Sequence, residues 1–229
     1  HVNMLKKMDY LNNDESQKLI DELNFISKES KKGNFNILKS QEDCHTAIED
    51  HLIKTCGDSG EKIHTARSRN DQVLTALRLY YRDSIENIQK LLNDLASVLE
   101  VFSNKNGEIE FPGYTHMQKA MPSSIKLWSK AYIEAINDDK ILLETAHKLI
   151  NQCPLGSGAG FGLPIDIDRE FVAKELKFDS VQSNPIYCQL SRGKFELYLI
   201  NILTQIMFNI NRIASDIILF STDEFKFFS

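Results

Sequence analysis

Apolar residues recur every three or four positions over three long stretches of this chain. The first stretch runs from Leu74 to Phe102 without an internal Gly or Pro. The second runs from Pro122, a residue favoured in the first helical turn, to Ile150, and the third runs from Phe195 to Phe220. This spacing is the helical one, so the pattern predicts three long helices, each about 45 Å in length at 1.5 Å per residue.

Long helices with an apolar stripe bury little surface alone and must pack side by side, which predicts a helix bundle. Helices of this length exceed what a compact domain of 229 residues needs. We therefore expect the bundle to continue across subunits, with the Ile-rich helix at 195–220 buried on all sides.

The first sixty-five residues have a different pattern, with shorter helices expected at 13–31, opened by Asp14, and at 41–56. Glycine-containing turns at 32–34 and 57–60 separate them. Apart from a short extended piece at 107–111, we find no convincing strand pattern. The predicted fold class is therefore all-α, with a smaller helical domain at 1–65 followed by a central long-helix bundle domain at 66–229.

Composition narrows the functional classes. The net charge of −5 argues against a nucleic-acid partner, and no apolar run approaches the length of a membrane span. The start carries no secretory signal, and the four cysteines lack a CxxC spacing, so we expect reduced thiols, no metal site and a cytoplasmic location. Because the chain opens on His1 and closes on an apolar Phe227-Phe228-Ser229, we expect a fragment that lacks both ends.

The densest polar cluster is the segment 65–71, directly before the first long helix. Arg67, Ser68, Arg69 and Asn70 place two guanidinium groups, a hydroxyl and an amide in four consecutive residues. Such a set suits a small ligand with several carboxylates, because the arginine fork matches a carboxylate in a bidentate way. The alternative is an ordinary helix cap.

A second cluster, at 112–118, holds His116 between Thr115 and Gln118 in a turn that contains Gly and Pro. Histidine is the side chain best suited to proton transfer near neutral pH, so His116 is the candidate acid or base. A loop histidine bonded to a backbone carbonyl is the alternative. The two clusters together favour a carboxylate clamp with a proton-transfer group.

Three further features have open roles. His45 lies four residues before Glu49 on the helix expected at 41–56, where an intrahelical pair is the simplest interpretation. Asp43 and Asp71 are expected to orient the basic residues. The glycine-rich segment 154–164 follows a predicted long helix instead of a predicted strand, and no βαβ pattern surrounds it, so we reject a dinucleotide fingerprint. It is either a structural crossover or a loop whose amides approach a ligand.

Four segments, at 42–49, 64–73, 112–118 and 154–159, resemble motifs of the argininosuccinate lyase family, within the larger fumarase/aspartase superfamily. They occur in the family order and span most of the chain. Two departures are evident. Ala66 stands where the family usually has Gly, and the stretch 184–194 agrees poorly with the common family version.

The resemblance implies an all-α homotetramer whose active sites are shared between subunits. It implies β-elimination of argininosuccinate to L-arginine and fumarate, with no cofactor. His116 matches the catalytic histidine, and Asn70 and Thr115 match substrate-binding positions. Arg67, Ser68 and Gln118 are further candidates for substrate contacts, and His45 is a candidate for a supporting role behind them.

The resemblance also places the family's catalytic serine on a loop after Ser229 and another ligand group before His1. The 229-residue chain alone is therefore expected to be inactive. Two alternatives stay open. One is a sister lyase that acts on adenylosuccinate, fumarate or aspartate, and the other is a non-catalytic, crystallin-like scaffold.

Overall fold

The computed structural model describes residues 1–228. It contains two compact units. The first comprises His1–Arg78 and Asn151–Arg192, and the second comprises Leu79–Ile150 and the chain from Gly193 onward. Helix α5 (Arg69–Asn106) contributes its first residues to the first unit and the remainder to the second. The compact units divide the chain after Arg78, Ile150 and Arg192. This division does not test the domain boundary expected at 65/66, which stays a prediction.

The first unit is built from short elements. Its helices are α1 (Val2–Lys7), α2 (Asn13–Lys31), α3 (Cys44–Cys56), α4 (Asp58–Lys62), α7 (Arg169–Glu175) and α8 (Pro185–Leu190). Two two-residue strands, β3 (Gln152–Cys153) and β4 (Ser180–Val181), pair in parallel. Both helices expected in the first sixty-five residues are confirmed. Asn12 caps α2 through a capping box with Glu15, so the cap expected at Asp14 is wrong.

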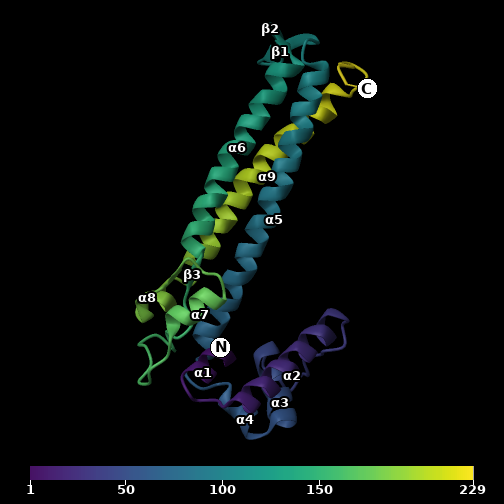
Figure 1. The fold of residues 1–229 in the computed structure, drawn as a ribbon. Coiled ribbons are helices and arrows are strands. Elements are labelled where there is room, and N and C mark those ends of the chain that lie inside the picture. The colour runs from purple at the N-terminus through teal and green to yellow at the C-terminus, as the bar shows by residue number, and fades with distance from the viewer. Residues whose placement is uncertain (229) are drawn as a thin grey trace. The chain divides into compact units, whose positions relative to one another are not determined.

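The second unit is a bundle of three long helices. Helix α5 lies beside α6 (Ile125–Ile150) and α9 (Lys194–Phe220) over most of its length (Figure 1). All three long helices predicted from the apolar spacing are confirmed. Their apolar stripes form one core, made of Ile85, Leu92, Leu99, Ile136, Leu143, Ala146, Ile150, Phe195, Leu199, Ile202, Ile206 and Ile213. The fold is mostly helical, as predicted.

A β-hairpin at one end of this bundle corrects the expected start of the second helix. Strands β1 (Glu110–Thr115) and β2 (Gln118–Ser124) pair antiparallel, and Pro122 lies opposite Pro112. Helix α6 therefore begins at Ile125. Both strands of a two-stranded ribbon are edge strands. A proline is tolerated there at a position whose backbone nitrogen points away from the partner strand, because no hydrogen bond between the strands is lost. Phe111 anchors the hairpin against Phe220 of α9.

Helix α9 is not buried on all sides within the chain. Its row of Phe195, Leu199, Ile202, Ile206 and Ile213 is buried, whereas another face exposes large apolar side chains. These are Leu197, Ile200, Met207, Phe208 and Ile218, each exposed by 54% to 71%. Within residues 1–228, no helix is both long and apolar enough to cross a membrane.

Candidate active site

Ser68 and Asp71 close the N-terminus of α5. The hydroxyl Oγ of Ser68 accepts a hydrogen bond from the backbone N–H of Asn70 at 3.0 Å, and Oδ1 of Asp71 accepts one from the N–H of Ser68 at 3.1 Å. Ser68 thus caps the helix through the N–H of its second residue, and the side chain of the third residue, Asp71, reaches back to the N–H of Ser68. The helix-cap interpretation is therefore correct for Ser68. The side-chain amide of Asn70 lies 3.5 Å from the same hydroxyl, at the long end of hydrogen-bond distances.

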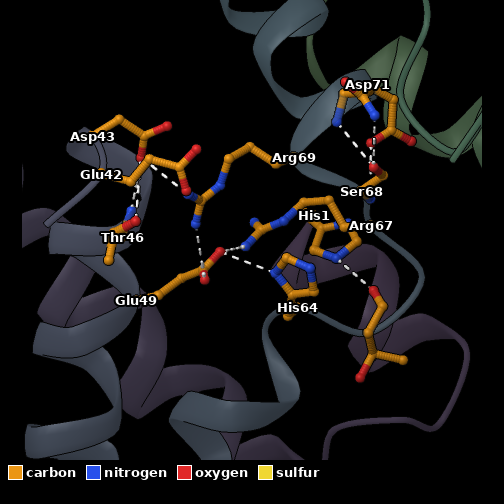
Figure 2. Close-up of polar contacts among 12 residues, drawn as sticks. His1, Glu42, Asp43, Thr46, Glu49, His64, Arg67, Ser68, Arg69 and Asp71 are labelled. Atoms are coloured by element: carbon orange, nitrogen blue, oxygen red, sulfur yellow. Dashed lines mark hydrogen bonds and ion pairs between the residues drawn. The ribbon is translucent and has the colours of Figure 1, made fainter. Parts of the chain in front are cut away.

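Glu49 of α3 is the partner of the two arginines, as Figure 2 shows. Its Oε1 accepts from Nη2 of Arg67 at 2.9 Å and lies 3.0 Å from Nδ1 of His64, while its Oε2 lies 3.8 Å from Nη2 of Arg69. Arg69 also donates to Glu42 at 2.6 Å. The arginine-rich segment thus meets protein carboxylates on α3 and just before it. Sequence reasoning missed this role of Glu49.

Arg67 is the more deeply placed of the two arginines, with 9% of its side chain exposed, against 29% for Arg69. Burial lowers the pKa of Arg67, and the Glu49 carboxylate opposes that change. Arg67 also lines a cavity of about 280 Å³ together with Gln72, inside the first unit. Within the described part of the chain, the buried atoms Nε of Arg67 and Oε1 of Gln72 have no hydrogen-bond partner.

His45 occupies the first turn of α3 and is half-buried. The intrahelical pair expected with Glu49 is wrong for the described residues, because the carboxylate of Glu49 bonds to His64 and Arg67. Asp43 caps α3 by accepting from the N–H of Thr46 at 3.0 Å. It also lies 3.6 Å from Arg69, so its expected pairing with a basic residue is confirmed.

Asp71 is fully buried and behaves differently from the expectation that it orients basic side chains. Its two oxygens accept backbone N–H groups, from Ser68 on one side and from Gly156 and Gly158 on the other. Burial raises the pKa of this carboxyl, and the N–H groups of Gly158, Gly156 and Ser68 oppose the rise. The glycine-rich loop therefore directs two amides at an internal carboxylate, which favours the structural-crossover interpretation of that loop.

His116 lies at the tip of the hairpin in the second unit. Thr115 and Gln118 face each other in the strand register, so His116 and Met117 are the two central residues of a two-residue turn. Both have positive φ, at 50° and 63°. Turns with positive φ at both positions match the twist of the paired strands, and they usually carry Asn or Gly. All four residues of the turn are exposed, which leaves the imidazole open to a ligand.

The seven predicted site residues thus divide between the two units. His45, Arg67, Ser68 and Asn70 belong to the first unit, and Thr115, His116 and Gln118 belong to the second. The first group offers an amide, a hydroxyl and the imidazole of His45 beside the guanidinium of Arg67, which is paired with Glu49. The second offers an imidazole flanked by a hydroxyl and an amide. Within residues 1–228, no group of three or more His, Cys, Asp or Glu side chains is placed to hold a metal ion.

A family model described as "Lyase" matches residues 2–229. The chain belongs to the lyase family. Among its relatives, the argininosuccinate lyase of Thermotoga neapolitana is 51% identical over 227 residues, which cover 99% of this chain and 57% of the relative. The argininosuccinate lyase of Phocaeicola vulgatus is 40% identical, with 99% and 51% covered. The predicted resemblance is confirmed, and the chain spans about half the length of these curated relatives.

Solved structures of lyases have the same fold. An EDDS lyase in complex with formate superposes with a TM-score of 0.88 at 23% identity, covering 99% of this chain and 44% of that one. A fumarate lyase:delta crystallin from Brucella melitensis, bound to cobalt, gives a TM-score of 0.82 at 19% identity, covering 97% and 54%. At these identities the likeness establishes the fold of the chain and nothing of its substrate.

Ala66 has a physical explanation within the lyase family. Its φ is 58°, in the left-handed region, where a Cβ costs about 1–2 kcal/mol. A glycine, the residue that the argininosuccinate lyase motif usually carries here, avoids that cost. This chain therefore keeps the turn before α5 with a residue less suited to it.

Proposed function

We propose that this protein is an argininosuccinate lyase, which cleaves argininosuccinate to L-arginine and fumarate. In this β-elimination a base removes a proton from the carbon next to a carboxylate, and the electron pair left behind forms the C=C bond of fumarate. The C–N bond breaks, and the departing guanidinium nitrogen takes up a proton. The observation that carries the proposal is the 51% identity over 227 residues with an argininosuccinate lyase.

In this proposal His116 handles the proton of the leaving guanidinium nitrogen. Its position at an exposed, two-residue turn supports the role, because the ring is accessible to a ligand. Thr115 and Gln118 would donate hydrogen bonds to substrate beside it. Asn70, with Ser68, would bind a carboxylate at the start of α5, where the helix dipole also favours an anion.

Arg67 and His45 are assigned weaker roles. The guanidinium of Arg67 is already paired with Glu49, so a substrate carboxylate would have to share it. The unpartnered Nε of Arg67 is the atom that supports a contact with a ligand. His45, in the first turn of the helix that carries Glu49, would support the charged cluster from behind.

We further propose that the enzyme is a cytoplasmic homotetramer with sites shared between subunits. Two observations support the shared site. The predicted site residues fall into two compact units, and α9 exposes an apolar face within the chain. Asn70 lies in the first unit and His116 in the second, and the resemblance to argininosuccinate lyases implies that different subunits supply them to one site.

The test is fumarate release by the protein as its gene encodes it, with argininosuccinate, adenylosuccinate and aspartate as substrates. We expect release from argininosuccinate alone. A His116→Ala variant should lower kcat by about 100- to 10,000-fold, the usual contribution of a positioned acid or base. His147→Ala is the matched control, because His147 lies on α6 near Glu86 and should leave the rate unchanged.

Other results would point to the alternatives. Release from adenylosuccinate or aspartate would keep the elimination and discard argininosuccinate as the substrate. Silence with all three substrates from a folded protein would favour a crystallin-like scaffold. We also expect the 229-residue chain alone to be inactive, and fumarate release by it above the level of its His116→Ala variant would contradict that expectation.

A further inference from the structure

The carboxylate of Asp71 joins two segments of the first unit that lie far apart in the sequence. Its Oδ2 accepts the N–H of Gly156 at 2.9 Å and of Gly158 at 2.8 Å, while its Oδ1 accepts the N–H of Ser68 at 3.1 Å. The residue is 0% exposed. In all three contacts a carboxylate oxygen accepts a backbone N–H, a role that an amide nitrogen in the same place could not fill.

The backbone conformation of the 156–158 loop allows two of its N–H groups to bind the Asp71 carboxylate. Gly156 and Gly158 have φ of 87° and 64°, a conformation that turns both N–H groups toward the same oxygen. A side chain at Gly156 would be strained by the positive φ, and its Cβ would displace Ile167 and Arg169, whose Cδ1 and Cγ would lie 2.5 Å and 2.8 Å from it. Arg169 fixes the loop further, through a 3.0 Å hydrogen bond to the carbonyl of Leu155. These contacts hold the loop in place, so Asp71 can anchor Ser68 to it.

The other side of the link leads to Asn70. Asp71 holds the N–H of Ser68, and the Ser68 hydroxyl in turn accepts the N–H of Asn70 at 3.0 Å. Arg192 donates to the carbonyl of Asn70 at 3.2 Å. The backbone of Asn70 is thus held from both directions, while its side-chain amide has only the long, 3.5 Å contact with the hydroxyl of Ser68.

We infer that Asp71 is a positioning residue, which places Asn70 for substrate by tying the start of α5 to the 156–158 loop. The inference rests on the proposed function, in which Asn70 binds a substrate carboxylate. An asparagine at position 71 has nearly the same shape but replaces one acceptor oxygen by an NH₂ donor. That donor would face either the N–H of Ser68 or those of the two glycines, so at least one side of the link would open.

Kinetics of the protein as its gene encodes it distinguish positioning from mere stability. We expect Asp71→Asn to raise the KM for argininosuccinate about 10-fold and to lower kcat/KM by up to about 100-fold, as for a displaced binding group. A purely structural role would reduce the amount of active enzyme and leave KM unchanged. In an Asn70→Ala background, Asp71→Asn should raise KM no further, because the two residues act in sequence.

The matched control is Asp168→Asn. Asp168 caps α7 by accepting the N–H of Phe171 at 2.8 Å, so it is another capping aspartate in the same unit. We expect its KM to equal that of the wild type. Additive effects of Asp71→Asn and Asn70→Ala on KM, or an equal rise in Asp168→Asn, would overturn the inference.

Hydrogen–deuterium exchange tests the link without any turnover. The amides of Gly156 and Gly158 should be protected in the wild type and exchange faster in Asp71→Asn, with α9 unchanged. Rapid exchange at both glycines in the wild type would refute the link, and that measurement stands even if a variant does not fold. Asp71→Glu, which keeps the charge but lengthens the side chain, replaces Asp71→Asn in that case and should also raise KM. If the wild type releases no fumarate, the proposed function fails, and the exchange result still decides whether Asp71 holds the loop.

Discussion

At the scale of single residues, Glu49 controls the charge balance of the arginine-rich segment. It contacts His64, Arg67 and Arg69, and Arg67 is almost fully buried beside it. A Glu49→Gln substitution keeps the side-chain shape but leaves the buried guanidinium with a neutral partner. We expect the free energy of unfolding to fall by about 1–3 kcal/mol, the usual cost of removing one partner of a buried polar pair.

Equilibrium denaturation at fixed protein concentration measures this change. Glu42→Gln is the matched control, because Glu42 pairs with Arg69 but has 76% of its side chain exposed. Its effect should stay below about 1 kcal/mol, as is usual for exposed ion pairs. Equal effects of the two substitutions would show that burial of Arg67 does not make its pairing with Glu49 matter more.

The candidate site residues were identifiable from the sequence because each motif is local. The contacts of these residues were not, because they join distant positions. Glu49 precedes Arg67 by 18 positions, and Gly156 follows Asp71 by 85. Helical spacing pairs Glu49 with His45, four residues earlier on the same helix. It cannot predict that the fold brings α3 against the turn before α5.

At the scale of elements, the regular spacing of apolar residues predicted the long helices. The hairpin was not predicted, because its strands lack a regular apolar spacing. The strand at 118–124 has no alternating pattern because it is exposed or half-buried along its whole length. Pro122 also fits a helix start as well as it fits an edge strand. The predicted extended piece at 107–111 overlaps only the first residues of β1.

The hairpin turn carries a strain that can be tested. Met117 has φ of 63° and is 92% exposed, so glycine would relieve the left-handed conformation without losing packing within the chain. Relief of about 1–2 kcal/mol outweighs the extra backbone entropy of glycine, about 0.5–1 kcal/mol. We expect Met117→Gly to raise the free energy of unfolding by up to about 1 kcal/mol, measured by chemical denaturation.

Met121→Gly provides the control with the opposite expected sign. Met121 is 74% exposed and lies in β2, where the backbone is extended and glycine brings only its entropy cost. That variant should lose about 0.5–1 kcal/mol. A loss of stability in Met117→Gly as well would mean that the Met117 side chain is buried in the assembled protein, most simply against another subunit.

At the scale of the whole molecule, the exposed face of α9 is the feature that a single chain leaves unexplained. Ile200 and Met207 are seven residues apart, which places them on the same side of the helix, and they are exposed by 58% and 59%. Contiguous apolar surface of this kind marks association. In the proposed homotetramer this face packs against other subunits, and each site draws its residues from more than one chain.

In the protein as its gene encodes it, replacing Ile200 and Met207 together by lysine should therefore dissociate the assembly, while each chain keeps its helical content. Light scattering coupled to size-exclusion chromatography measures the mass, and circular dichroism measures the helicity. Asn137→Lys, at an exposed polar position of α6, should keep the wild-type mass. An unchanged mass in the double variant would show that this face is no interface. Dissociated chains that still release fumarate would show that one chain holds a complete site. A shared site requires that fumarate release is lost when the assembly falls to the mass of a single chain.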